Sequence, residues 1–289
     1  PPAAGLDAGS RCAMRIRVAG VTSTSPPGNR GAHRPIAATA LLFAANGAIF
    51  GAIVPRLPDL KDALELSPAL FGLAMACYPA GALFGGLLTP VFMRRRSDGA
   101  VAVGTMIAAS VVAALVGFSP VVAVFAGLLL LFGVCDAVTD VSMNAHGIRV
   151  QLRHGRSLIN RFHAVWSLGA VLGAAGGSLA AGFGTPVQVQ MIVAAIVCAA
   201  AAAVAYPLRL GPPVAEDEDG RDLDRARGEA PVADQPVEPV ERRRPGGRAL
   251  VLLVVLGVFA CCAEIVEDFA QTWSALYLRD VAAVGAGVA

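Results

Sequence analysis

Charged residues along this chain fall into short groups that are separated by long apolar stretches. No Asp, Glu, Lys or Arg occurs in residues 36–54, 69–93, 99–135, 162–208 and 249–263. A helix needs about 20 apolar residues to cross about 30 Å of hydrocarbon, so the two longest stretches hold two spans each. Turn sequences at Ser119-Pro120 and at Gly182 to Pro186 separate those spans. The pattern predicts seven membrane spans, at residues 36–57, 69–93, 99–118, 120–146, 162–183, 186–206 and 249–277.

The composition supports a membrane protein. Hydrophobic residues make up 56% of the 289 residues and charged residues 15%, whereas about a quarter of the residues in soluble domains are charged. The predicted fold class is therefore an all-α polytopic membrane protein, and a soluble α/β enzyme is excluded. The sequence has no phosphate-binding loop, and its six cysteines form no metal or redox pattern. We expect no enzyme activity, no catalytic residue, no cofactor, no metal and no nucleic-acid partner.

The distribution of Arg and Lys predicts the orientation of the spans, because cytoplasmic loops carry the excess of these residues. With the N-terminus inside, 20 of the 23 Lys and Arg residues lie in the predicted cytoplasmic segments. The outer segments then hold Arg56, Lys61 and Arg279. We therefore expect a multi-pass protein of the bacterial cytoplasmic membrane with a cytoplasmic N-terminus.

Residues 207–248 separate the first six spans from the seventh. They include the acidic run Glu216 to Asp219 and several prolines, a composition that cannot bury an apolar core. The small apolar residues at 282–289 resemble the start of an eighth span, so we expect the chain to be a fragment. We predict four regions: a disordered cytoplasmic tail at 1–35, a six-helix bundle at 36–206, a disordered cytoplasmic linker at 207–248, and a seventh span that begins an incomplete second bundle at 249–289.

Two segments carry a resemblance to a known family. The first runs from Asp140 to Gly169 and includes Arg161-Phe162-His163-Ala164-Val165-Trp166, and the second runs from Glu267 to Asp280. Together they resemble the major facilitator superfamily permeases of the bacterial YbjJ type, which are related more distantly to fucose permeases. The resemblance implies two six-helix bundles joined by a cytoplasmic linker, with transport by alternating access.

Two positions depart from this family. Thr272 stands where members usually have an acid just before the Trp-Ser of the seventh span. The loop after span 2 lacks the Asp that the superfamily carries after its glycine, and it keeps only the basic run Arg94 to Arg96. The resemblance therefore does not imply that this loop takes part in gating in this protein.

Span 4 contains ionisable residues, which are costly in hydrocarbon and are therefore candidates for a transport site. Asp136, Asp140 and Asn144 are spaced by four residues and share one helix face. We predict a proton or hydroxyl site at Asp136, with Asn144 on the same pathway and Asp140 in a cytoplasmic gate with Arg149 and Arg161. The alternative is that both acids only stabilise the closed state by pairing with Arg149, Arg153 or Arg161.

Polar residues also occur in spans 1 and 5. Asn46 lies midway along span 1 beside Gly47, where small residues let a helix or a ligand approach. Its amide can bind a solute hydroxyl but cannot carry a proton, and an interhelical hydrogen bond is an equal alternative. His163 and Trp166 begin span 5 at the cytoplasmic side. We place both in the gate, His163 as a partner of a span 4 acid or as an interfacial anchor, and Trp166 in an aromatic belt.

Predicted span 7 carries three acids. Glu264, Glu267 and Asp268 crowd one side of the helix, and their mutual repulsion favours a shared proton. Glu264 lies deepest in the hydrocarbon, whereas Glu267 matches the family better, and we keep both as pathway candidates. Trp273 joins them and, with Tyr277, forms an outer aromatic belt.

These features predict a secondary active transporter that moves a small polar solute, such as a sugar or a related metabolite, by alternating access. Protons are the expected coupling ion, and the complete protein is expected to be monomeric in the lipid bilayer. Proton-coupled multidrug efflux is the alternative, although residues 121–135 lack the buried Arg that such antiporters commonly carry. A non-transporting membrane sensor or an inactive remnant is the alternative of another class.

Overall fold

The computed structural model describes residues 30–211, 247–285 and 287. Most of the predicted tail at 1–35 and of the predicted linker at 207–248 lies outside the described residues. Within them, every regular element is a helix. The elements are α1 (Arg30–Ile53), η1 (Val54–Arg56), α2 (Leu57–Ala63), α3 (Pro68–Met75), α4 (Cys77–Arg95), α5 (Asp98–Val116), α6 (Val122–His154), α7 (Ile159–Gly182), α8 (Val187–Ala205), η2 (Tyr206–Leu208) and α10 (Gly247–Asp280).

Six helical segments of the described residues are long and apolar enough to cross a membrane. They are His33–Ala63, Pro68–Arg95, Asp98–Val116, Val122–His154, Ile159–Gly182 and Val187–Leu208. These segments coincide with the first six predicted spans, and the all-α polytopic fold class is confirmed. The seventh predicted span falls within α10, in which the described apolar run is Ala249–Phe259. A seventh crossing therefore stays a prediction.

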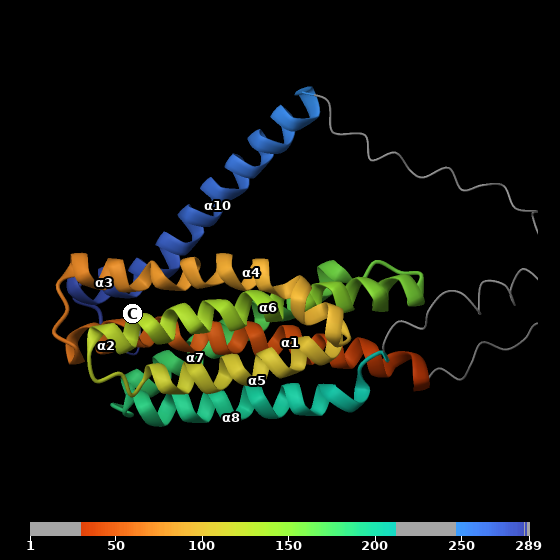
Figure 1. Ribbon diagram of the computed structural model, residues 1–289. Coiled ribbons are helices and arrows are strands. Elements are labelled where there is room, and N and C mark those ends of the chain that lie inside the picture. Colours follow the sequence, from red (N-terminus) through yellow and green to blue (C-terminus); the bar gives the residue numbers. More distant parts are fainter. Residues whose placement is uncertain (1–29, 212–246, 286, 288–289) are drawn as a thin grey trace, which may run out of the picture.

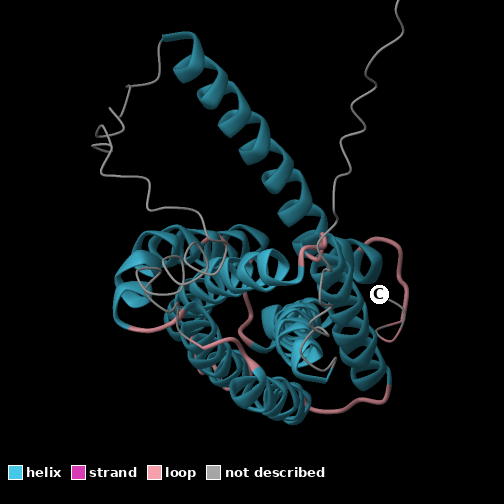
Figure 2. Cartoon of the chain, turned by 90° about the vertical axis from the view of Figure 1, so that its right-hand side faces the viewer, coloured by secondary structure: helices cyan, strands magenta, loops and turns pink. Residues whose placement is uncertain are grey.

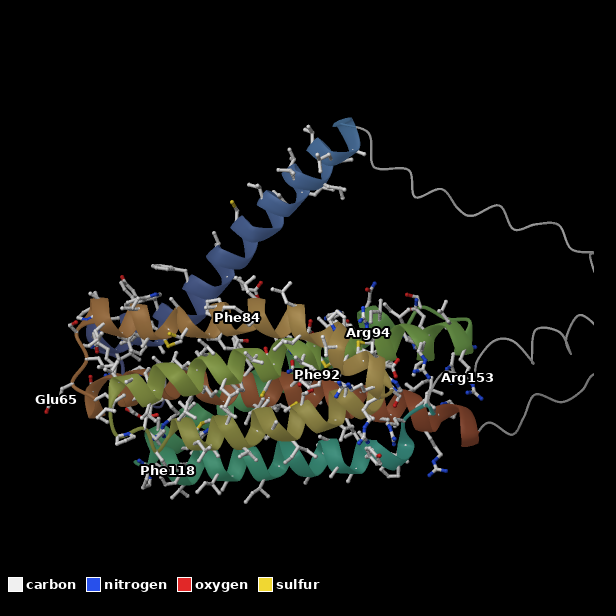
Figure 3. The ribbon with its side chains drawn as sticks, viewed as in Figure 1. Glu65, Phe84, Phe92, Arg94, Phe118 and Arg153 are labelled. Atoms are coloured by element: carbon white, nitrogen blue, oxygen red, sulfur yellow. The ribbon has the colours of Figure 1, made fainter. Side chains whose placement is uncertain are left out.

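Helices α1 and α4 to α8 run side by side along one axis (Figure 1). α1 packs mainly against α7, α4 against α6, and α5 against both α6 and α8. The end-on view in Figure 2 shows these helices as one bundle, from which α10 departs at an angle. Figure 3 shows Arg94 and Arg153 towards one end of the bundle, which we call the arginine-rich end, and Glu65 and Phe118 at the opposite end.

Helix α6 ends later than predicted, at His154 rather than at residue 146. Its C-terminal turn stops at Gly155, whose φ of 62° lies in the left-handed region that favours glycine. The extension is polar in sequence but has a buried side, because Val150 is fully buried and Arg149 forms an ion pair. The prediction ended this span too early because it relied on stretches without charged residues, and the extension contains charged residues.

Glycines allow two helix pairs to approach backbone to backbone. A Cβ added at Gly47 of α1 would meet the carbonyl oxygen of Trp166 in α7. Likewise, a Cβ added at Gly133 of α6 would meet the carbonyl oxygen of Tyr78 in α4. Larger residues would force these helices apart, since small residues are what permits such close packing between membrane helices. The two contacts bring the Trp166 and Tyr78 side chains close to polar groups on the facing helices.

Candidate functional site

A hydrogen-bonded polar cluster connects α1, α4, α6 and α7 inside the bundle. The Asn46 amide nitrogen donates to Asp136 Oδ1 at 2.6 Å, and the Tyr78 hydroxyl donates to Asp136 Oδ2 at 2.7 Å. The indole Nε1 of Trp166 donates to the Asn46 amide oxygen at 2.7 Å. Each of the four helices thus contributes one side chain to a single connected network. We call Asn46, Tyr78, Asp136 and Trp166 the central cluster.

Aromatic rings border the central cluster. The ring centroid of Phe50 lies 5.8 Å from that of Tyr78 and 6.4 Å from that of Trp166. The ring centroid of Phe132 lies 5.6 Å from that of Tyr78. The central cluster therefore combines hydrogen-bonding groups with aromatic faces at one place in the bundle.

Asp136 is the ionisable member of the central cluster. It lies near the middle of α6, about 21 Å from the helix N-terminus at about 1.5 Å per residue. Both of its oxygens accept hydrogen bonds from neutral groups, and it forms no ion pair with any residue that the structure describes. A carboxyl balanced by neutral donors can take up and release a proton without breaking a salt bridge. The arrangement is therefore chemically suited to proton exchange and to hydrogen bonding with a polar ligand.

The structure brings together three of the residues selected from the sequence, Asn46, Asp136 and Trp166, and adds Tyr78. Asn46 and Asp136 are in direct contact although 90 positions separate them. Tyr78 was missed; its only sequence signal is a hydroxyl in an apolar span, where a buried Tyr usually has a partner. Trp166 does not act as an interfacial belt residue, because its indole N–H donates to Asn46 inside the bundle, and its gate role stays a prediction. The close approach at Gly47 makes that contact possible.

A second polar cluster joins α5, α6 and the segment after α8 at the arginine-rich end. Arg149 donates to Asp98 Oδ1 at 2.6 Å and to the Gly211 carbonyl oxygen at 2.6 Å. His146, which is fully buried, lies 3.2 Å from the same Asp98 oxygen through its Nδ1. Arg149 thus pairs with Asp98 and not with Asp140, and a gate role for Arg149 stays a prediction. Nine residues are about two and a half turns, so the two side chains lie on opposite faces of α6.

The other predicted gate residues are more exposed. The Asn144 amide donates to Asp140 Oδ1 at 3.0 Å, within α6. Arg161 is exposed near the start of α7. The His163 ring packs edge-on against Phe43, with centroids 5.3 Å apart. The gate assignments of Asp140, Arg161 and His163 stay predictions, as does a pathway role for Asn144.

Ion pairs join α10 to α2 at the opposite end of the bundle. Arg279 lies 3.2 Å from Asp59 Oδ1 and 2.7 Å from Asp62 Oδ2. Lys61 lies 3.5 Å from Asp280 Oδ2. These pairs connect parts of the chain that are more than 200 positions apart, so no local sequence pattern indicates them.

The candidates of predicted span 7 are placed only in part. Trp273 packs against Phe71 and Phe269, with ring centroids 5.9 Å away in each case. Glu267 is exposed on α10. The side chains of Glu264 and Asp268 lie outside the described residues. A role for the acids of this helix therefore stays a prediction.

Comparison with known proteins identifies the family. A model of the Major Facilitator Superfamily matches residues 39–288. An uncharacterised transporter of Sinorhizobium fredii is 33% identical over 247 residues, which are 83% of this chain and 58% of that protein. An uncharacterised MFS-type transporter of Yersinia pestis is 29% identical over 140 residues, which are 48% of this chain and 36% of that protein. The alignment thus spans little more than half the length of the first relative. Because the family match covers most of the chain and agrees with the six membrane-length helices among the described residues, the chain belongs to the major facilitator superfamily.

Proposed function

We propose that this protein is a secondary transporter that moves a small polar solute, sugar-like or a related metabolite, by alternating access. The central cluster forms one wall of the solute site, and the second bundle, which begins with α10, supplies the other wall. The single observation that carries the proposal is the hydrogen-bonded chain from Trp166 through Asn46 and Asp136 to Tyr78. The two relatives that are named as transporters support it.

The chemistry of the central cluster suits a solute with several hydroxyl groups. Asn46 and Tyr78 can each donate and accept hydrogen bonds, and the Asp136 carboxyl accepts them. The aromatic faces of Trp166 and Phe50 can pack against the apolar face of a sugar-like ring. When a solute enters the site, hydrogen bonds to its hydroxyl groups replace the hydrogen bonds that now link the four side chains.

Proton coupling is assigned to Asp136 under this proposal. The carboxyl is held by neutral donors, so its protonation does not leave a buried cation unpaired. Asn46 cannot take this role, since an amide does not titrate at physiological pH. The orientation with a cytoplasmic N-terminus and the closer relationship to the YbjJ group belong to the same proposal.

The test uses the full-length protein in proteoliposomes. Uptake of a panel of labelled monosaccharides and polyols is measured with and without an inward proton gradient, together with solute exchange at equal pH. The Asp136→Asn variant should lose accumulation driven by the gradient but retain exchange, because the site remains but its proton does not. Equal accumulation by this variant and the parent protein would contradict proton coupling through Asp136.

A matched pair of tyrosine variants tests the solute site itself. Tyr78→Phe should weaken solute affinity about fivefold, the effect of losing one hydrogen bond of about 1 kcal/mol. The control is Tyr206→Phe, since Tyr206 is exposed beyond α8 and stacks on Arg209.

If no member of the panel is transported and only drug resistance increases in an overexpressing strain, the protein is an efflux antiporter instead.

A further inference from the structure

A pocket at the arginine-rich end contains the basic run Arg94 to Arg96, which the central cluster does not use. Its volume is about 620 Å³, within the range of about 300–1,000 Å³ found for small-molecule sites. It lies between the end of α4, the start of α5 and the last turns of α6. We call it the arginine pocket, and its lining residues are Met93, Arg94, Arg95, Arg96, Ser97, Asp98, Ala145, Ile148 and Arg149.

The arginine pocket has an excess of positive charge. The three arginines of the run are exposed, and they form no ion pair with any residue that the structure describes. The one acid in the lining, Asp98, is held by Arg149 at 2.6 Å and by the backbone N–H of Gly99 at 2.6 Å. Because Arg149 and Asp98 balance each other, about three positive charges remain to attract an anion.

An apolar helix face adjoins the pocket. Along α4, the side chains of Leu83, Phe84, Leu87 and Val91 are each at least half exposed. The segment is long and apolar enough to cross a membrane, and it ends at Arg95 (Figure 3). The pocket therefore lies where a lipid-facing surface gives way to a cluster of cations, and Met93 and Ile148 extend its apolar lining.

We propose that the arginine pocket binds the phosphate headgroup of an anionic phospholipid, with the acyl chains lying along the apolar face of α4. Guanidinium groups bind phosphate oxygens through paired N–H donors, which makes arginine well suited to this ligand. A soluble phosphate would use the same donors, but it would gain nothing from the adjoining apolar face. Near an anionic membrane surface, each basic residue contributes about fivefold to affinity.

The test measures lipid binding to the purified full-length protein in a neutral detergent. The protein is titrated with dioleoylphosphatidylglycerol, and bound lipid is counted by native mass spectrometry, with dioleoylphosphatidylcholine as the uncharged comparison. The parent protein should retain phosphatidylglycerol preferentially. The variant R94Q/R95Q/R96Q should bind phosphatidylglycerol at least tenfold more weakly. The largest loss of affinity expected is about a hundredfold, because each of the three charges contributes about fivefold.

A matched control separates the pocket from general surface charge. The variant R153Q/R156Q/R161Q removes three exposed arginines near the same end that do not line the pocket. It should change phosphatidylglycerol affinity far less than the pocket variant. An equal loss in both variants, or equal binding of the two lipids by the parent protein, would overturn the proposal.

Two further measurements complete the test. The first separates loss of charge from loss of folding, and the second shows whether the pocket binds a phospholipid or a soluble anion. The variant R94K/R95K/R96K keeps the three charges, so it should retain most of the binding even if the glutamine variant does not fold. Loss of binding in the folded lysine variant would contradict a site based on charge. Inorganic phosphate at millimolar concentration should not displace the lipid; full displacement would show that the pocket is a site for soluble phosphate rather than for a phospholipid.

Discussion

The hydrogen bond between Tyr78 and Asp136 should be measurable as a coupling free energy. Tyr78→Phe removes the hydroxyl that donates to Asp136 Oδ2 at 2.7 Å and leaves the ring next to Phe50 and Phe132. Asp136→Leu removes the acceptor and keeps a side chain of comparable length. Together with the double variant, these changes form a thermodynamic cycle that isolates the interaction between the two side chains.

The distance indicates the magnitude of this coupling. Hydrogen bonds between helices of membrane proteins contribute about 0.6 kcal/mol on average, whereas bonds to a charged group contribute about 1.5–3 kcal/mol. The 2.7 Å between the Tyr78 hydroxyl and Asp136 Oδ2 lies at the long end of the range of about 2.5–2.7 Å for a hydroxyl bound to an ionised acceptor. We therefore expect a coupling of about 1.5–3 kcal/mol where Asp136 is ionised. It should fall towards about 0.6 kcal/mol on acidification, because a protonated carboxyl is a weaker acceptor.

The assay is equilibrium unfolding of the full-length protein in mixed micelles, followed by circular dichroism over a range of pH. The control cycle pairs Asp136→Leu with Tyr206→Phe, whose ring lies beyond the end of α8. The two control changes should be additive within about 0.3–0.5 kcal/mol. If the cycle of Tyr78 and Asp136 is additive to the same degree at every pH, the hydrogen bond does not stabilise the bundle and our interpretation of the central cluster is refuted.

Two other substitutions test the packing and the buried charge. Gly47→Ala should lower the free energy of unfolding by about 1–3 kcal/mol, since the new Cβ meets the Trp166 carbonyl oxygen and α1 must move away from α7. Asp98→Asn should lower it by about 3 kcal/mol, the lower end of the range for a broken buried pair, because its partner Arg149 is 27% exposed. Thermal and denaturant unfolding in detergent measure both effects.

Each of these substitutions has a control on the same fold. Gly127→Ala places a Cβ where no atom lies within 4 Å, so it should be neutral or stabilising. Asp140→Asn changes an exposed acid and should alter stability by no more than about 0.5 kcal/mol. If Gly47→Ala is as mild as Gly127→Ala, α1 and α7 are not in close backbone contact. An Asp98→Asn variant as stable as Asp140→Asn would mean that the ion pair is not structural.

The helices of the bundle could be predicted from the sequence because transfer between water and lipid acts on each stretch of chain separately. Residues 36–54 and 162–208 contain no charged side chain; the first stretch lies in one helical segment of membrane length, and the second covers parts of two that are separated by a turn. Where a helix is held by tertiary contacts instead, this criterion failed. The last eight residues of α6, from Gly147 to His154, include two arginines and a histidine and are helical in the structure.

The site could be predicted only one residue at a time. Asn46 and Asp136 stood out because polar groups in hydrocarbon are costly, and this cost does not depend on the partner. Their contact with each other, and the inclusion of Tyr78, depend on which faces of α1, α4 and α6 meet. Those faces are set by close backbone contacts between helices, for which the sequence shows only a glycine.

The sequence by itself determined which segments are membrane-length helices and which side chains need a partner there. The tertiary structure decided which residues are those partners. Trp166 donates a hydrogen bond to Asn46 inside the bundle, and Arg149 pairs with Asp98 rather than with Asp140. The physical reason is that the cost of burial is a property of each residue and its neighbours along the chain. Pairing instead depends on helix rotation and on contacts between residues far apart in the sequence, such as Asn46 and Trp166, which are 120 positions apart.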